Sequence, residues 1–396
     1  MTVNAHLHKL SKLHRHSQQV ILDNQQHGGY LACPTMPDYQ FSWFRDGAFI
    51  AYALTLDGIY NMVPHRAGMS GQWDSAMKFH QWCARIINDR ADALERTISR
   101  AALGQPLVLA DTLNARYQTD GAAGPADWPE FQLDGPGLWV WSLAKYVEVC
   151  RVKPLPADWE YAVNLVARYL TAVWRSPCYD CWEERGDDVH ISTLAAIYAG
   201  LGAAQRLIPA LSVEATRADI RTFILEHGLT PGGELAKSVG LDIVDANLLL
   251  AALPDHGLLA PDDPLMIRTV ARIERDLLAE GHGVHRHTAD TYYGGGAWIL
   301  LGLWLAWHKT QTGDFAGARK LVAWAEAHAD AEGNLPEQVC DVMLDGTYYD
   351  VWVQQRGEIA NPLVWSHAKY LLVQHALRGT GEMAFAESHR VTKKSL

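Results

Sequence analysis

The sequence has little cysteine and a marked excess of acidic over basic residues. Six cysteines in 396 residues do not make a disulfide framework, so free thiols are expected. The formal net charge of -11 argues against a nucleic-acid partner or an anionic membrane surface, because such partners are bound through faces rich in Lys and Arg. Alternating patterns of β-branched residues are also scarce, which argues against a mainly β fold.

Apolar segments long enough to span a membrane, or placed to act as an export signal, are missing as well. Residues 1–19 contain no continuous apolar stretch of the kind found in secretory signals, and no later stretch is long and apolar enough to span a bilayer. We therefore expect a cytoplasmic protein with no membrane partner, no nucleic-acid partner and no obligate protein partner.

Two short motifs contain metal-binding side chains, but neither has the spacing of a known metal site. Cys178 and Cys181 form a single C-x-x-C without a second pair or a βαβ context, which favours packed thiols over half a metal site or a redox pair. The segment GHGVHRHTAD does not follow the H-E-x-x-H pattern. Its candidate ligands are His282, His285, His287 and Asp290. We expect no metal and no other cofactor.

The sequence is rich in long apolar runs, several of them at helical spacing. Six of these runs are too long for strands. They are GAFIAYAL, GLWVWSLAKYVEV, STLAAIYAGLGAAQRL, DANLLLAAL, GAWILLGLWLAWHKT and NPLVWSHAKYLLVQHAL. Amphipathic stretches lie between them, such as SAMKFHQWCARIIND and FAGARKLVAWAEAHADAEG, with charge on one face. The pattern predicts an all-α protein.

The two kinds of helix predict two layers. Six nearly all-apolar helices would form a buried inner ring, and the amphipathic helices would cover them. This is the arrangement of an (α/α)6 barrel rather than of a bundle of a few long helices. No Pro/Gly/Ser-rich linker or shift in composition divides the chain. We predict a single domain over residues 1–396, with no accessory β-sandwich or carbohydrate-binding domain.

Acidic, arginine and aromatic residues recur just before the apolar helices. The segments are PDYQFSWFRD, ADWPEFQLDGP, CWEERGDDVH, SVGLDIVD, HRHTADTYYGG, GNLPEQV and GEIANP. If the inner helices run parallel around a ring, these entrances meet at one end and line one pocket. Aromatic faces stack on sugar rings while Arg, Asp and Gln bind hydroxyl groups, so the mixture favours a carbohydrate. The aromatic candidates are Trp43, Trp128, Trp182, Tyr292 and Trp298, although each alone is as easily a core residue.

Two carboxylates in these segments suit glycoside hydrolysis, which commonly uses one protonated and one ionised Asp or Glu. An aromatic-walled pocket raises the pKa of a carboxyl, and a nearby carboxylate raises it further. One of Glu183 and Glu184, which directly follow Trp182, can therefore stay protonated near neutral pH. Glu337 is the candidate partner across the pocket. Each glutamate alone is more easily explained as a solvated surface residue, but the set together favours catalysis.

The ordered series of motifs resembles the family 15 glycoside hydrolases, which include glucoamylases, glucodextranases and some bacterial trehalases. The matching segments are PDYQFSWFRDGAF, QLDGPG, WEERG, LDIVDANLLL, ADTYYGGGAWILLGLW, GNLPEQ and NPLVWSHAKYLL, in the family's order, from about residue 30 to 375. The resemblance implies an (α/α)6 barrel. It also implies an exo-acting enzyme that releases β-glucose from non-reducing ends of α-glucosides, with inversion at the anomeric carbon.

The resemblance also implies roles for particular residues. Glu183 matches the general acid, Glu337 the general base, and Tyr39 the tyrosine that helps to hold the attacking water. Arg45 and Asp46 match the pair that grips the terminal glucose. Further substrate contacts are predicted for Trp43, Trp128, Trp182, Glu184, Arg286, Tyr293 and Trp298. Inversion requires the two catalytic carboxyls to lie roughly 6.5 to 9.5 Å apart, so that water fits between the sugar and the base.

The predicted substrate is a short oligosaccharide rather than starch. Compact intracellular members that this chain resembles include isomaltose glucohydrolases, so isomaltose and α-1,6-linked oligosaccharides come first, then α-1,4-linked substrates and trehalose. The segment CDVMLDGTYYDVWVQQRGEIA departs from the family's pattern. Two other classes stay open: an (α/α)6 sugar epimerase, which would not need Glu183 and Glu337, and a non-catalytic sugar-binding protein.

Overall fold

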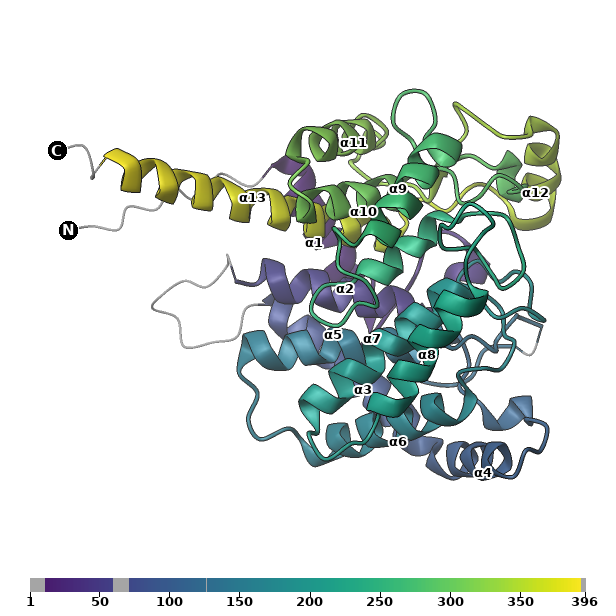
Figure 1. Ribbon diagram of the computed structural model, residues 1–396. Coiled ribbons are helices and arrows are strands. Elements are labelled where there is room, and N and C mark those ends of the chain that lie inside the picture. Colours follow the sequence, from purple (N-terminus) through teal and green to yellow (C-terminus); the bar gives the residue numbers. More distant parts are fainter. Residues whose placement is uncertain (1–10, 60–70, 126, 393–396) are drawn as a thin grey trace.

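The computed structural model describes residues 11–59, 71–125 and 127–392, which form a ring of helices wrapped by a second layer of helices (Figure 1). Residues 1–10, on which part of the prediction about export signals depends, lie outside these ranges. No helix within the described ranges has both the length and the apolar character needed to cross a membrane.

Six inner elements follow the six apolar runs. They are α2 (Phe44–Asp57), α5 (Asp134–Cys150), α7 (Ile191–Leu207), η3 (Ala246–Ala252), α10 (Ile299–Gln311) and α13 (Val364–Thr392). Each contacts the next along the chain, and α13 contacts α2, so the ring closes. Every residue of α2 is buried, as expected for a helix that is apolar on all sides.

The amphipathic helices form the outer layer. They are α1 (Lys12–Asp23), α3 (Gly71–Asp89), α6 (Ala157–Val173), α8 (Glu214–His227), α9 (Pro264–Leu277) and α11 (Phe315–Ala327). The first, α1, packs on α13; α3 packs on α2, α8 on α7, α9 on η3 and α11 on α10, while α6 contacts both α3 and α7. Helix α4 (Ala91–Ala102) lies against α6. The all-α (α/α)6 barrel predicted from the sequence is confirmed.

The fourth inner element differs from the prediction. The run DANLLLAAL was expected to form a helix like the other five, but Ala246–Ala252 form a seven-residue 3-10 helix. The Asp245 side chain caps its start by accepting a hydrogen bond from the Asn247 backbone N–H. Pro254 follows shortly after its end, and a proline and its preceding residue both disfavour a continuing helix. The apolar run therefore predicted burial correctly, but not the helix type.

Two glycines let α5 and α7 pack closely. A Cβ atom on Gly137 would lie 2.6 Å from the carbonyl oxygen of Ala196, and one on Gly200 would lie 2.5 Å from the Cα of Gly137. Side chains at these positions would force the two helices apart, because a packed interior has no space for an added methyl group.

Short strands join the loops at one end of the ring. Strand β3 (Ser42–Trp43) pairs with β4 (Arg116–Tyr117), and β5 (Ala297–Trp298) pairs with β6 (Gln338–Val339), both antiparallel. A third pair, β1 (Gln25–Gln26) and β2 (Gly29–Tyr30), follows α1. The β5–β6 pairing brings Glu337 to the start of α10, where the Ile299 N–H donates to the Glu337 carbonyl oxygen at 3.1 Å.

Candidate active site

A cavity of about 270 Å³ lies where the N-terminal ends of the inner helices meet. Its lining comes from the entrances of α2, α5, α7, α10 and α13, so most of the predicted segments converge on one pocket. The segments SVGLDIVD, before η3, and GEIANP were predicted to take part but contribute no lining residue. Its volume is close to the lower end of the range for small-molecule sites, about 300 to 1,000 Å³.

Most of the predicted site residues line this cavity. They are Tyr39, Trp43, Arg45, Asp46, Trp128, Trp182, Glu183, Glu184, Arg286, Trp298 and Glu337. The exception is Tyr293, which is fully buried away from the lining and donates its hydroxyl hydrogen to the Gly357 carbonyl oxygen at 2.7 Å. The neighbouring Tyr292 lines the cavity instead, with its hydroxyl 3.1 Å from that of Tyr39.

Glu183 stands in a tight turn before α7, in the left-handed backbone conformation with φ 62°. Asp180 shapes this turn, because its Oδ1 accepts hydrogen bonds from the backbone N–H groups of Trp182 and Glu184, both at 2.9 Å. The Glu183 carboxyl accepts from Arg45 at 3.4 Å and Gln132 at 3.2 Å. Burial raises the pKa of Glu183 to about 7, although both of these bonds favour the ionised form.

Glu337, directly before β6, lines the same cavity and is 2% exposed. Its backbone N–H donates to the Ala360 carbonyl oxygen at 2.9 Å, which fixes the main chain here. The Tyr39 hydroxyl favours the ionised form of this carboxyl, and Oε2 has no hydrogen bond within the described ranges. Burial raises the pKa of Glu337 to about 8, and the charge of Glu183 adds to this effect.

The first turn of α2 places a buried arginine and aspartate in the cavity lining, with Arg45 4% and Asp46 7% exposed. Arg45 Nη1 donates to Gln132 Oε1 at 2.7 Å and to Asp134 Oδ2 at 3.1 Å. Burial raises the pKa of Asp46 to about 6. Gln132 and Asp134 stand in the segment QLDGPG, which was noted in the sequence, but neither was predicted as a site residue.

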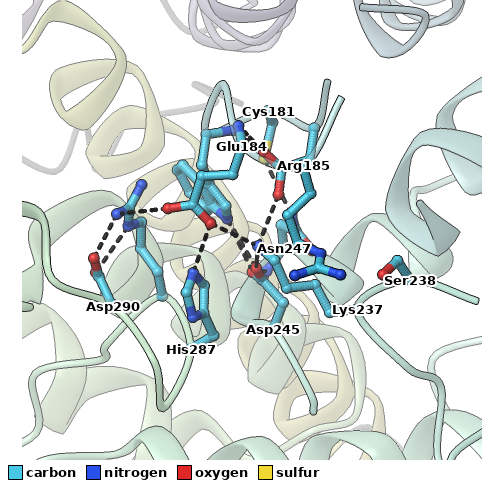
Figure 2. Close-up of polar contacts among 12 residues, drawn as sticks. Cys181, Glu184, Arg185, Lys237, Ser238, Asp245, Asn247, His287 and Asp290 are labelled. Carbon is cyan, nitrogen blue, oxygen red and sulfur yellow. Dashed lines mark hydrogen bonds and ion pairs between the residues drawn. The ribbon is translucent and has the colours of Figure 1, made fainter. Parts of the chain in front are cut away.

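Glu184 is surrounded by three basic side chains, as Figure 2 shows. Its Oε1 lies 3.2 Å from Arg286, and its Oε2 lies 2.9 Å from His287 Nε2 and 3.3 Å from Lys237 Nζ. Burial alone would raise the pKa of Glu184, but these three neighbours hold it well below its usual range. Glu184 is therefore an ionised hydrogen-bond acceptor at any working pH.

Lys237 lies beside Glu184 and is 2% exposed (Figure 2). Its Nζ is 2.7 Å from both Asp180 Oδ2 and Asp245 Oδ2. Asp245 also accepts from the Trp182 indole N–H at 3.0 Å. One buried cation thus connects the turn that carries Glu183, the Trp182 ring and the cap of η3. The sequence analysis missed Lys237, since a single lysine in a loop is normally a surface residue.

The histidine-rich segment and the C-x-x-C pair make structural contacts. His285 Nδ1 lies 2.9 Å from the Gly295 carbonyl oxygen, and Asp290 pairs with Arg286. Cys178 and Cys181 are buried free thiols, and burial raises the pKa of Cys178 to about 12. Among the residues that the structure describes, no three His, Cys, Asp or Glu side chains are grouped as metal ligands.

Several cavity-lining residues have buried polar atoms without a hydrogen bond to any described residue. These atoms are the indole nitrogens of Trp43, Trp128, Trp298 and Trp365, Glu337 Oε2, Arg45 Nε and Asp46 Oδ1. Buried polar groups are normally hydrogen-bonded, because leaving them unpaired costs roughly 1 to 3 kcal/mol each. The aromatic faces of this lining can stack on sugar rings.

A helical double ring that holds two buried carboxyls in an aromatic pocket defines an (α/α)6-barrel protein with a carbohydrate-type site. The family described as Glycosyl hydrolases family 15 matches residues 10–314, and the chain belongs to this family. It is therefore a glycoside hydrolase.

Particular relatives agree with this assignment. The chain is 36% identical over 381 residues to the isomaltose glucohydrolase of Kribbella flavida, which covers 93% of this chain and 94% of the relative. A solved glycosidase has a TM-score of 0.85 at 35% identity and covers 95% of this chain and 99% of its own. Another solved structure, of a substituted glycosidase in complex with glucose, has the same TM-score at 34% identity, with the same coverage.

Proposed function

We propose that this glycoside hydrolase releases β-glucose from the non-reducing end of short α-glucosides, preferably isomaltose and other α-1,6-linked oligosaccharides. The observation that carries the proposal is the pair Glu183 and Glu337, two buried carboxyls with raised pKa values in the lining of one cavity. Arg45 and Asp46 would grip the terminal sugar, so that only a chain end enters. The 36% sequence identity to an isomaltose glucohydrolase supports the preference for α-1,6 linkages.

In the proposed reaction, Glu183 gives its proton to the glycosidic oxygen as the bond to the anomeric carbon breaks. Glu337 takes a proton from a water that attacks the opposite face of the sugar, and Tyr39 helps to hold this water. The product is β-glucose, because attack from the opposite face inverts the anomeric carbon. The two carboxyls then return to their starting protonation by exchange with solvent.

The remaining predicted residues would bind the sugars. Ionised Glu184 and its partner Arg286 suit the hydroxyl groups of the leaving sugar. The rings of Trp43, Trp128, Trp182 and Trp298 supply flat apolar surfaces. One continuous hydrophobic core, with members from Val20 to Val373, supports the proposal that the chain acts as a single domain. The cytoplasmic location stays a prediction.

The stereochemistry of the product tests this function directly. We expect that isomaltose mixed with the purified protein gives the β-anomer signal of glucose first in proton NMR, and the α-anomer only later by mutarotation. Maltose and trehalose in separate tubes test the two other linkages. Initial α-glucose would contradict the role of Glu337, and glucose from none of the three would favour an epimerase or a sugar-binding protein.

The raised pKa values predict a bell-shaped pH profile of kcat/KM. Well below pH 7 both carboxyls are protonated and no base remains, whereas well above pH 8 both are ionised and no acid remains. We therefore expect the maximum between about 7 and about 8, with two apparent pKa values that belong to the pair. Initial rates in a buffer series give this profile, and a maximum near pH 4.5, typical of ordinary carboxyls, would contradict it.

A further inference from the structure

The segment of residues 340–359, here called the arm, leaves the barrel directly after β6. It contains η5 (Gly346–Tyr348) and α12 (Tyr349–Arg356), and Figure 1 shows α12 at one edge of the molecule. The arm begins and ends beside the candidate site, because the Glu337 N–H donates to the Ala360 carbonyl oxygen. It lies beyond residues 10–314, which match the family.

The arm is fastened to the entrance of α10. The Asp345 N–H donates to the Gly294 carbonyl oxygen at 3.0 Å, and the Trp352 ring packs on the Tyr292 ring with their centroids 4.9 Å apart. Gly294 has a φ of 80°, and a Cβ atom there would lie 2.8 Å from Met343 Sδ, so only glycine allows this close approach. The arm therefore has a defined position against the cavity.

Arg356 joins the arm to two other loops. It forms an ion pair with Asp38, and its guanidinium carbon lies 5.6 Å from the centre of the Trp128 ring. All three residues line the cavity. The side chains of Arg356 and Asp38 are 40% and 38% exposed, whereas those of Arg45 and Asp46 are 5% and 10% exposed. The three-way contact therefore lies at the mouth of the cavity, and Arg45 and Asp46 lie at its inner end.

We propose that the arm limits the length of the oligosaccharides that this enzyme hydrolyses. Arg356 narrows the mouth of the cavity, and Trp352 forms a wall for the leaving-group sugar. The inference rests on the proposed function. A substrate whose terminal glucose reaches Arg45 and Asp46 must extend its remaining sugars through the mouth. The bridge from Arg356 to Asp38 and Trp128 narrows this exit, which favours a disaccharide over longer chains.

The test compares kcat/KM for isomaltose with kcat/KM for isomaltotetraose in wild type, Arg356→Ala and Trp352→Ala. We expect the ratio of the first value to the second to fall by about tenfold or more in both variants, because losing one pocket contact typically changes discrimination by about this much. Asp38→Asn removes the ion pair but keeps Arg356, so the ratio should fall in the same direction by a smaller factor.

Arg206→Ala is the matched control, because Arg206 also forms an exposed ion pair, with Glu148, on helices away from the cavity lining. Its ratio should equal that of wild type. An active wild type with unchanged ratios in Arg356→Ala and Trp352→Ala would overturn the role of the arm alone. A wild type that hydrolyses neither substrate would instead overturn the proposed function. Melting temperatures within a few degrees of wild type would show that the variants are folded.

Discussion

Replacing Glu183 by Gln is expected to lower kcat/KM for isomaltose by about 10²- to 10⁴-fold, the usual contribution of general acid catalysis. Glutamine keeps the size of the side chain and still accepts hydrogen bonds from Arg45 and Gln132, but it has no proton to give to the glycosidic oxygen. Glu337→Gln should cause a loss of similar size, because the attacking water then has no base. Initial rates of glucose release measure both effects.

A substrate whose leaving group needs no proton separates the two roles. On α-glucosyl fluoride, Glu183→Gln should come within about tenfold of wild type, whereas Glu337→Gln should stay strongly impaired. Glu332→Gln removes an exposed carboxyl close to Glu337 in the sequence and should keep the wild-type rate on both substrates. An equal loss on both substrates in Glu183→Gln would show that Glu183 does not act as the acid.

The ring of helices could be predicted because burial on all sides leaves a simple pattern in the sequence. Helices α2 and α10 are apolar around their whole circumference, so their place in an inner layer follows from composition alone. The η3 segment has the same apolar character but a different hydrogen-bond pattern. Hydrophobicity reports whether a segment is buried, but not which hydrogen-bond pattern its helix takes.

The candidate site could be predicted where residues stand at helix entrances, because the ring brings these entrances together. Tyr292, named among the pocket aromatics, lines the cavity, whereas Tyr293, predicted as a substrate contact, does not. Which of two adjacent tyrosines faces the cavity depends on local backbone angles, and Tyr293 has an unusual φ of 49°. Arg356 lies on the arm, and the position of the arm depends on contacts with loops that are distant in the sequence. Such contacts leave no periodic signal in the sequence.

Lys237→Met is expected to lower the free energy of unfolding by about 3 to 5 kcal/mol, the usual cost of removing one partner from a buried ion pair. Methionine fills a similar volume but leaves Asp180 and Asp245 buried without their cation, and both aspartates are at most 1% exposed. Activity should fall as well, because Asp180 shapes the turn that carries Glu183. Urea denaturation followed by circular dichroism measures the stability loss.

Two further variants test whether the loss of stability in Lys237→Met comes from the buried charges that it leaves unpaired. Lys78→Met removes an exposed lysine that pairs with Asp74 along one helix face, with side chains 54% and 42% exposed, so its loss should stay below about 1 kcal/mol. Adding Asp245→Asn to Lys237→Met removes one of the stranded carboxylates and should recover part of the lost stability. If wild type and Lys237→Met unfolded at the same urea concentration, the ion pairs of Lys237 with Asp180 and Asp245 would not stabilise the fold.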